Sequence, residues 1–434
     1  MRLSASAAAE ALGGVLHGPD ALFDGASVDS RTVAAGQLFV PIVAARNGHR
    51  FIADARSAGA AAYLTSEPPV GGTAIVVCDT AQALWELGAF ARGLLPDRII
   101  GITGSVGKTT VKDLVAGGLG ARLSTHATRA SYNNELGVPI TLLGAPDGVE
   151  AVVVEMGARF PGDIRRLCDL VRPAIGVVTS IGSAHLEHLG GREGVAREKG
   201  TLVAGLPASG FAVLNEVDCG PDMRSRTDAT VITFGSDSGD VRAVVLDRDA
   251  ELRPTIRIES PWGTGEVTLA VRGDHQAVNA AAAVAAVVCA GVGFDDALAG
   301  VAEAVGTQLR AEFWQTPSGL RVLNDSYNAN PDSVEAALHS LATVGAPRRV
   351  AVLGEMAELG GSAHEAHRRM GALAEALGIE VVSVGVPEYG GTVVEDQAEA
   401  LAVVATLPVD SVVLVKASRS VGLDRLADVL RDEG

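Results

Sequence analysis

The sequence predicts an α/β protein built from three domains. Its 434 residues are too many for one ordinary core, since domains average about 150 residues. Hydrophobic residues make up 47% of the chain and aromatic residues only 4%, and 52 glycines accompany abundant alanine and valine. This balance is typical of parallel sheets that are joined to helices by tight turns.

The first block, residues 1–97, carries alternating strand and helix signals. The apolar runs "GQLFVPIV", "AAAYLTS" and "TAIVVCD" predict strands, and "HRFIADARSAGA" predicts a helix between two of them. The segment "MRLSASAAAEALGG" lacks the apolar core of a signal peptide, so we expect a short helix that ends at Gly13–Gly14. The segment "ARGLLPDR" closes the block.

The second block, residues 98–307, begins with a strand that enters a glycine-rich turn. The runs "EAVVVEMG" and "AIGVVTSIG" predict further strands. Residues 215–275 are polar and rich in glycine and aspartate, with shorter alternating strands such as "VRAVVL" and "TIRIES". An alanine-rich helix after Asn279 is expected to end the block near Gly306.

The third block, residues 308–434, alternates strand and helix patterns. The predicted strands are "RRVAVLGEM", "IEVVSVG" and "SVVLVKAS", and helices are expected from Ser362, Glu395 and Gly422. This alternation predicts a small parallel sheet.

The charge and the cysteines restrict the partners and the compartment. The formal net charge of −17 predicts an acidic surface that repels nucleic acid and anionic lipid, so an anionic ligand needs a local positive site. The most apolar stretch, residues 280–290, is too short to span a bilayer. The four cysteines form no C-x-x-C pair, which favours reduced thiols. We therefore expect a cytoplasmic protein with no nucleic-acid partner and no membrane insertion. A monomer is expected as well, although none of these observations bears on the oligomeric state.

The stretch "GITGSVGKTT", residues 101–110, is typical of a phosphate-binding loop. Glycines let successive N–H groups point at phosphate oxygens, Lys108 adds a positive charge, and Thr109 offers a hydroxyl to Mg²⁺. The strict pattern G-x-x-x-x-G-K-[ST] asks for glycine where Ile102 stands, but Gly104 can supply the flexibility. The residues expected to bind nucleotide here are Gly104, Ser105, Gly107, Lys108, Thr109 and Thr110.

Two further strands of the second block end in residues that can hold a metal ion. The run "AVVVEMG" carries Glu155, and "GVVTSIGSAHLEHLG" carries His185. Ligands of parallel sheets bind at the carboxyl ends of strands, and carboxylate oxygens suit Mg²⁺. We therefore expect Glu155 and His185 beside the phosphates, although a single histidine after a strand is more often structural.

Together these residues resemble the Mur ligase family, the ATP-dependent amide-forming ligases of peptidoglycan precursor assembly. The family's glycine loop, G-x-x-G-x-x-G-K-T, has the spacing found here. The resemblance extends over the whole chain and includes "DSRTVAAGQLFV", "NNELGVPITLL", "VVEMGA", "SAHLEHLG" and "EKG". The stretches "NDSYNANPDS" and "LGEMAELG" resemble most closely the member that adds D-alanyl-D-alanine to a UDP-muramoyl tripeptide.

The resemblance implies a three-domain architecture and a reaction. The first domain would hold the uridine nucleotide end of the substrate, a central P-loop ATPase domain would bind ATP, and a Rossmann-like C-terminal domain would close over both. ATP and Mg²⁺ are the implied cofactors. The γ-phosphoryl group would activate a carboxylate as an acyl phosphate, and the amine of D-alanyl-D-alanine would displace phosphate to give an amide.

The resemblance also implies roles for particular residues. Lys199 matches the lysine that the family carbamylates; a bare ammonium would repel Mg²⁺, whereas a carbamate is an anionic oxygen ligand. The implied catalytic residues are Lys108, Glu155, His185 and Lys199, and the implied metal ligands are Thr109, Glu155, His185 and carbamylated Lys199. Asn279, Arg310 and Asp325 would contact ATP. The implied substrate-binding residues are Ser30, Arg31, Asn133, Asn134, Asn328, Asn330, Lys416, Ser418 and Arg419.

Plainer interpretations stand beside several of these roles. Without the resemblance, Lys199 would be taken for a solvated helix lysine. The stretches around Arg31 and Asn328 would be taken for ordinary turns, which asparagine and proline favour.

Two departures from the family pattern leave alternatives open. The stretch "HQAVN" has Gln276 where the family usually has asparagine, which keeps an amide. The stretch "FVPIVAARNGHRF", near the expected nucleotide end of the substrate, is about one residue short and lacks the usual Lys-Gly or Arg-Gly turn. A paralogous ligase that joins another amino acid or peptide to a different carboxylate carrier is therefore one alternative. A nucleotide-dependent switch is another, although a switch needs no carrier site and no third-domain clamp.

Overall fold

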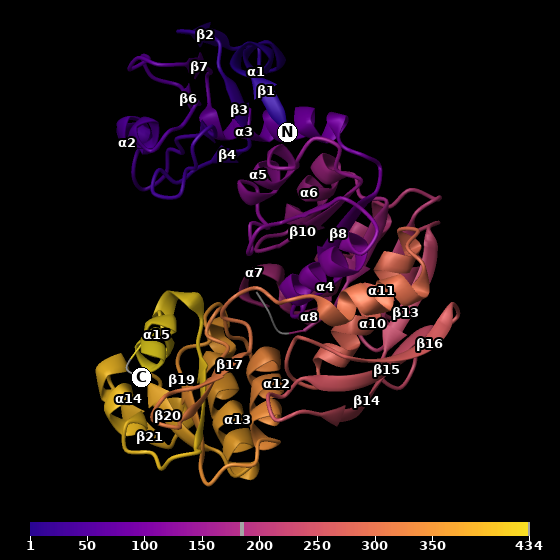
Figure 1. The fold of residues 1–434 in the computed structure, drawn as a ribbon, viewed down its shortest axis with the longest axis vertical. Coiled ribbons are helices and arrows are strands. Elements are labelled where there is room, and N and C mark those ends of the chain that lie inside the picture. The colour runs from indigo at the N-terminus through magenta and orange to yellow at the C-terminus, as the bar shows by residue number, and fades with distance from the viewer. Residues whose placement is uncertain (183–185, 433–434) are drawn as a thin grey trace.

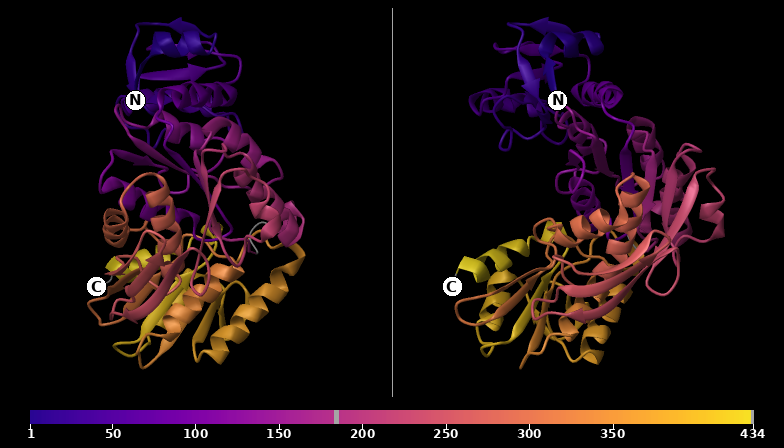
Figure 2. Two further views of the ribbon diagram at one scale, coloured as in Figure 1. Left: turned by 90° about the vertical axis from the view of Figure 1, so that its right-hand side faces the viewer. Right: turned by 45° about the vertical axis from the view of Figure 1, so that its right-hand side comes forward.

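The computed structural model describes residues 1–182 and 186–432, and three large sheets use successive stretches of this chain (Figure 1). The three sheets are stacked along the longest axis of the molecule, from the N-terminal sheet through the central sheet to the C-terminal sheet (Figures 1 and 2). The fold is α/β, as the composition predicts. From the separation of the sheets we propose domain limits of 1–97, 98–307 and 308–434.

The N-terminal domain contains a five-stranded sheet in the order β2-β7-β6-β5-β4, in which only β2 runs antiparallel to its neighbour, and a two-stranded ladder of β1 and β3. Within the predicted strand "GQLFVPIV", only Leu38–Phe39 form a strand, β5. The elements are β1 Arg2–Ser4, α1 Ala5–Ala11, β2 Val15–His17, β3 Leu22–Asp24, β4 Ala26–Ser27, β5 Leu38–Phe39, η1 Gly48–Phe51, α2 Ile52–Ser57, β6 Ala62–Thr65, β7 Ala74–Val76 and α3 Thr80–Leu94.

The central domain is built on a nine-stranded sheet, counted over its described residues, in the order β16-β15-β14-β13-β12-β11-β8-β10-β9. Strands β8 to β14 are parallel, and β14, β15 and β16 form an antiparallel extension. Its elements are β8 Ile99–Thr103, α4 Lys108–Gly120, β9 Thr125–Ala127, α5 Gly137–Leu143, β10 Ala151–Glu155, α6 Asp163–Val171, β11 Ile175–Val178, α7 Leu186–Leu189, α8 Gly191–Ala204, β12 Phe211–Asn215, α9 Pro221–Arg224, β13 Thr230–Gly235, β14 Val241–Arg248, β15 Pro254–Ser260, β16 Gly263–Thr268, α10 Gln276–Cys289 and α11 Phe294–Glu303.

The alanine-rich helix differs from its prediction at both ends. It begins at Gln276, before Asn279, and it ends at Cys289, so a separate helix α11 reaches Glu303. Residues 280–286, which are alanine except for Val284, are all fully buried, because small side chains let α10 pack tightly between α4, α11 and the sheet. Helix α10 thereby carries Asn279 to the glycine-rich loop.

The C-terminal domain contains a six-stranded sheet in the order β17-β18-β22-β19-β20-β21. The sheet is not wholly parallel as predicted, because the edge strand β17 pairs antiparallel with β18 in a hairpin that the sequence reasoning did not include. Its elements are β17 Glu312–Gln315, β18 Arg321–Asn324, α12 Pro331–Ala342, β19 Arg349–Leu353, η2 Gly360–Ser362, α13 Ala363–Ala376, β20 Glu380–Val384, η3 Pro387–Tyr389, β21 Thr392–Val394, α14 Gln397–Val404, β22 Val412–Lys416, η4 Arg419–Val421 and α15 Asp424–Asp432.

One hydrophobic core joins the N-terminal and central domains. Leu84 and Leu87 of α3 pack in the same buried cluster as Val138 and Leu142 of α5. A Cβ at Gly88 of α3 would lie 2.8 Å from the Pro139 side chain, so glycine permits this close approach of the helices. Within the described residues no helix is long and apolar enough to cross a bilayer, and all four cysteines are free thiols.

Candidate active site

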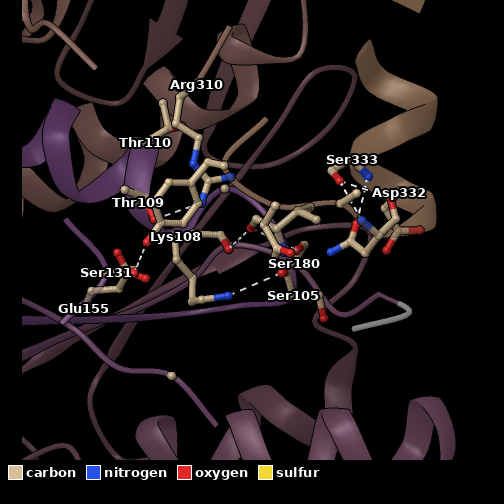
Figure 3. Close-up of a pocket in the computed structure, with 18 of the residues that line it drawn as sticks. Ser105, Lys108, Thr109, Thr110, Ser131, Glu155, Ser180, Arg310, Asp332 and Ser333 are labelled. Atoms are coloured by element: carbon tan, nitrogen blue, oxygen red, sulfur yellow. Dashed lines mark hydrogen bonds between the residues drawn. The ribbon is translucent and has the colours of Figure 1, made fainter. Parts of the chain in front are cut away.

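A cavity of about 920 Å³ lies where the central and C-terminal domains face each other. The glycine-rich loop, the ends of β10 and β11 and the start of α10 form its central-domain wall. The C-terminal domain contributes the start of α12 and the loops that follow β18, β19 and β22. Figure 3 shows Arg310 on the Thr109 side of the loop, and the Lys108 amine directed toward Ser105 and away from Arg310.

The backbone of the loop explains its glycines and the place of Ile102. Gly104 has φ +155°, and a Cβ there would lie 1.8 Å from the Thr179 hydroxyl oxygen. Gly107 has φ +83° at the N-terminus of α4, and its Cβ would lie 2.6 Å from Oδ1 of Asn279. Ile102 is fully buried in the core of the sheet, so its side chain does not compete for space in the loop. The turn requires glycine at 104 and 107 but not at 102.

Two hydroxyl residues at the end of β11 fix the loop. The Thr179 hydroxyl donates to the Val106 carbonyl oxygen at 2.5 Å, and the Val106 N–H donates to the Ser180 hydroxyl at 2.9 Å. The Ser105 N–H donates to the Ser180 carbonyl at 3.0 Å. Sequence reasoning did not include these two residues; their signal was a "TS" pair directly after an apolar strand, one strand away from the loop.

Two lysines meet at the loop. Lys108 Nζ donates to the Gly104 carbonyl at 2.6 Å, and Lys199 Nζ, from helix α8, donates to the same oxygen at 2.9 Å. Lys199 is 1% exposed, so the solvated helix lysine of the plainer interpretation is wrong. Desolvation, together with the charge of Lys108, lowers the pKa of Lys199 well below 10.5. Desolvation also lowers the pKa of Lys108. Burial therefore makes the charged form of both amines less favourable here than in water.

Glu155 has the features of a metal ligand. Its side chain stands at the end of β10 and is 1% exposed. Oε1 accepts a hydrogen bond from Asn133 Nδ2 at 2.7 Å, whereas Oε2 is buried and has no hydrogen-bond partner in the parts of the chain that the structure describes. A buried carboxylate oxygen that has no partner is costly unless a cation binds it. This arrangement fits Mg²⁺, which takes oxygen ligands.

The rest of a metal shell must come from other groups. His185 lies outside the described residues. Within those residues, no cluster of three or more His, Cys, Asp or Glu side chains could hold a metal ion. The Thr109 hydroxyl lies at the start of α4, on the same cavity wall as Glu155. Hydroxyl and phosphate oxygens are therefore the ligands that fit beside Glu155.

The C-terminal domain brings Arg310 to the loop. The Arg310 guanidinium stacks on the Tyr327 ring, 4.3 Å from its centroid, and Nη2 donates to the Thr109 hydroxyl at 3.5 Å. The Tyr327 hydroxyl in turn hydrogen-bonds the Ser131 hydroxyl of the central domain. Tyr327, which sequence reasoning did not assign, thus fixes Arg310 and joins the two domains.

Lys416 does not reach the cavity, contrary to its expected role in contacting substrate. Its side chain is fully buried, and Nζ donates to Asp325 Oδ2 at 2.5 Å and to the Asn328 carbonyl at 2.9 Å. The hydrogen-bonding capacity of the ammonium is consumed inside the domain. Asp325 and Asn328 do line the cavity, so Lys416 holds the segment that carries them.

Two of the asparagines that were expected to contact substrate also accept backbone hydrogen bonds at the start of a helix. Asn330 lines the cavity but caps α12, where Oδ1 accepts from the Ser333 N–H at 2.9 Å. Asn134 lines the cavity too, and its Oδ1 accepts from the Gly137 N–H at 2.9 Å at the start of α5. In both residues the amide nitrogen is the group that remains for a substrate.

Ser418 and Arg419 lie on the cavity wall near the loop after β19. The Ser418 hydroxyl accepts from the Ala357 N–H at 2.9 Å and donates to the Ala329 carbonyl at 3.3 Å, so it ties together three loops. Arg419 pairs with Asp424 at 2.8 Å.

Ser30 and Arg31 are not brought to this cavity. They lie in the N-terminal domain, where Arg31 is 84% exposed and pairs with Asp29 at 2.6 Å. The local geometry is that of an exposed turn. A ligand that touched both these residues and the glycine-rich loop would have to extend from one domain to the next.

The chain matches known families over most of its length. The model of the Mur ligase middle domain matches residues 102–287, and that of the Mur ligase glutamate ligase domain matches residues 309–419. Among curated relatives, the UDP-N-acetylmuramoyl-tripeptide–D-alanyl-D-alanine ligase of Mycobacterium leprae is 37% identical, with 94% of this chain and 92% of the relative covered. The enzyme of the same name from Escherichia coli is 33% identical, with 98% of this chain and 97% of the relative covered.

Solved structures agree with these matches. MurF from Acinetobacter baumannii superposes with a TM-score of 0.87 and 30% identity over 99% of both chains. MurF from Thermotoga maritima, in complex with ADP, gives a TM-score of 0.79 and 27% identity over 94% of this chain and 97% of that one. The relatives align with nearly the whole chain at more than 30% identity. The two domain models match the central and C-terminal domains, which together form the cavity. The chain therefore belongs to the Mur ligase family.

Proposed function

We propose that this chain catalyses the ATP-dependent joining of D-alanyl-D-alanine to UDP-N-acetylmuramoyl-tripeptide, with release of ADP and phosphate. The observation that carries the proposal is the cavity in which three features come together: a phosphate-binding loop, a Glu155 oxygen with no hydrogen-bond partner among the described residues, and Arg310 of the other domain. Relatives that bear the name of this activity align along nearly the whole chain. The chain is accordingly an enzyme of peptidoglycan precursor synthesis.

The chemistry needs activation because a carboxylate has no good leaving group. A carboxylate oxygen of the tripeptide attacks the γ-phosphorus of ATP, and the bond from that phosphorus to the ADP oxygen breaks. The amine of the dipeptide then attacks the acyl carbon, the carbon–oxygen bond to phosphate breaks, and the amine loses its proton. Positioning and electrostatic stabilisation supply most of the rate enhancement in such a transfer.

The loop and Arg310 supply that electrostatic stabilisation. The N–H groups at the start of α4 and the Lys108 ammonium face the phosphates in our proposal, and bound phosphate restores the charge that desolvation disfavours on Lys108. Arg310 reaches the same place from the C-terminal domain. Asn279, which packs against Gly107, is placed to contact the adenosine side of the nucleotide.

The metal site is proposed around Glu155. Bound Mg²⁺ would neutralise phosphate charge, with Thr109, Glu155, His185 and a carbamylated Lys199 as its protein ligands. Carbamylation suits Lys199 because a neutral amine is the form that reacts with carbon dioxide, and burial favours that form. The carbamate would also replace a repulsion between two lysines by an attraction.

The substrates are proposed to enter from opposite sides. Ser30 and Arg31 of the N-terminal domain hold the uridine nucleotide, and Asn133 and Asn134 contact the carrier near its reacting carboxylate. The dipeptide lies against the C-terminal wall. Its proposed contacts are Asn328, Asn330, Ser418 and Arg419, whereas Asp325 on the same wall is proposed to contact ATP.

Water must be kept from the acyl phosphate. The contact of Ser131 with Tyr327 and the ion pair of Arg159 with Glu358, 3.0 Å long, join the two domains across the cavity. The C-terminal domain thereby covers the loop and shields the activated carboxylate. We further propose that the enzyme acts in the cytoplasm as a monomer.

The test is a reconstitution with purified protein, Mg²⁺, ATP, UDP-N-acetylmuramoyl-tripeptide and D-alanyl-D-alanine. Phosphate release that requires both substrates, together with a product whose mass equals the joined substrates less water, is the expected result. Phosphate release that ignores both substrates would favour the nucleotide-dependent switch. Turnover only with another carrier or another amine from a panel would favour the paralogous ligase.

A further inference from the structure

A pair of oppositely charged residues, buried Lys112 and half-buried Asp113, lies one turn beyond Lys108 on helix α4. Lys112 is 2% exposed, and its Nζ donates to the Thr128 carbonyl at 2.8 Å and to the Ala130 carbonyl at 3.3 Å. The same Nζ lies 2.9 Å from Asp113 Oδ1. Neither side chain lines the cavity, so neither has a part in the proposed contacts with substrate.

The lysine of this pair holds the segment 128–134, which orients Glu155. The Glu155 N–H donates to the Thr128 hydroxyl at 3.0 Å, and Asn133 Nδ2 donates to Glu155 Oε1 at 2.7 Å. Between them, Ala130 has φ +50°, a conformation that alanine seldom adopts and that its surroundings must impose. The two hydrogen bonds from Lys112 lie on either side of this strained turn and are placed to impose it.

The aspartate of the pair holds the segment 307–311, which carries Arg310. Asp113 Oδ2 accepts from both the N–H and the hydroxyl of Thr307 at 2.8 Å each. Leu309 has φ +63° and Ala311 has φ +50°, so Arg310 is displayed between two strained residues. The anchor at Thr307 fixes the start of this short connection between the central and C-terminal sheets.

Both segments also contact one residue of the C-terminal domain, Tyr327. Ser131 of the first segment hydrogen-bonds Tyr327, and Arg310 of the second stacks on the Tyr327 ring. A closed ring of contacts therefore runs from α4 through each segment to Tyr327. Helix α4 begins at Lys108, directly after the glycine-rich turn, so this ring of contacts is attached to the phosphate-binding loop itself.

We propose that Lys112 and Asp113 are positioning residues, which set Glu155 and Arg310 at their places around the triphosphate without touching it. The turnover part of this inference rests on the proposed ligase function. Misplacing reacting groups by about 1 Å can cost on the order of 10²-fold in rate without a comparable loss of binding. Loss of the pair should therefore lower kcat far more than it weakens nucleotide binding.

Four variants test this inference. Lys112→Met removes both carbonyl contacts, and we expect kcat to fall by about 10- to 100-fold while ADP affinity changes less than about twofold. Lys112→Arg keeps the charge and the donors and should recover part of the rate. Thr307→Val removes one hydrogen bond, for which a two- to tenfold loss of kcat is expected, as about 0.5–1.5 kcal/mol implies. The control, Asp296→Asn, breaks only the exposed ion pair with Arg122 just beyond α4 and should change nothing.

Hydrogen–deuterium exchange with ADP bound separates this inference from the proposed function. Lys112→Met should raise exchange in both 128–134 and 307–311, and Asp296→Asn in neither, whatever the wild-type enzyme does with the muramoyl substrate. Unchanged exchange in the second segment would overturn the inference. So would parallel losses of turnover and ADP binding, measured below each melting temperature. If Lys112→Met does not fold, Thr307→Val decides: unchanged kcat and unchanged exchange in 307–311 would reject the pair as positioning residues.

Discussion

A methyl group at Gly104 should disable the phosphate-binding loop while leaving the rest of the central domain folded. The new Cβ would lie 1.8 Å from the Thr179 hydroxyl oxygen, although real Cβ atoms almost never approach another atom within 3.0 Å. One of the two must move by about 1.2 Å. The Gly104 carbonyl also accepts hydrogen bonds from Lys108 and Lys199, so displacing residue 104 displaces both amines.

The cost of Gly104→Ala can be worked out from two contributions. The backbone at φ +155° is strained for alanine, which costs about 1–3 kcal/mol. Moving Thr179 loses its hydrogen bond to the Val106 carbonyl, worth about 0.5–1.5 kcal/mol. The two contributions add to about 1.5–4.5 kcal/mol. If the phosphate-binding segment bears this whole cost, the Kd for ADP rises by about 10- to 1,600-fold.

Calorimetric titration of ADP, in the presence of Mg²⁺, measures this increase directly. Gly120→Ala is the matched control, because Gly120 lies at the end of the same helix with nothing within 4 Å of its would-be Cβ. The control should bind ADP normally and gain up to about 1 kcal/mol of stability. The variant Gly104→Ala/Thr179→Ala, with the clashing oxygen removed, should recover part of the affinity. Wild-type ADP affinity in Gly104→Ala would refute the reasoning.

Three more predictions concern the charges of the site and of the C-terminal domain. Lys108→Ala and Glu155→Ala should each lower amide formation by at least about 10²-fold with an unchanged melting profile; near-normal turnover in either would remove that residue from the site. Asn133→Ala, which frees Glu155 Oε1, should weaken Mg²⁺ by about 10- to 100-fold in a titration of turnover, and an unchanged titration would count against its role. Burial lowers the pKa of His367 below 6.5, and its Nε2 accepts a hydrogen bond from the Met356 N–H. Between the lowered pKa and 6.5 the unfolded chain binds a proton that the folded chain does not, so the unfolding free energy falls as the pH falls through 6.5. Thermal unfolding from about pH 7 to 5 should show a shallower acid loss in His367→Gln than in the wild type, and equal slopes would contradict this account.

The sequence by itself determined the elements whose signals are local. An apolar run, three glycines and a Gly-Lys-Thr ending lie within the twelve residues 99–110, and together they predict a strand, a turn and the start of a helix. Glu155 was placed by the same means, because an apolar run ends directly at its position. The α/β class and the nucleotide loop could be predicted because backbone preference and side-chain period are properties of neighbouring residues.

Tertiary structure alone decided which distant residues share a contact. Lys199 reads as an ordinary helix lysine, yet α8 carries it to the Gly104 carbonyl, 95 positions away in sequence. Lys416 follows an apolar strand and was expected to face substrate, but the parallel pairing of β18 with β22 sets it against Asp325. Nothing in the periodicity of either strand specifies that β22 lies between β18 and β19. The order of the strands depends on burying one face of the sheet against α12 and α13 and the other against α14 and α15. This packing involves the whole domain, and it determines which charged side chains lie next to each other.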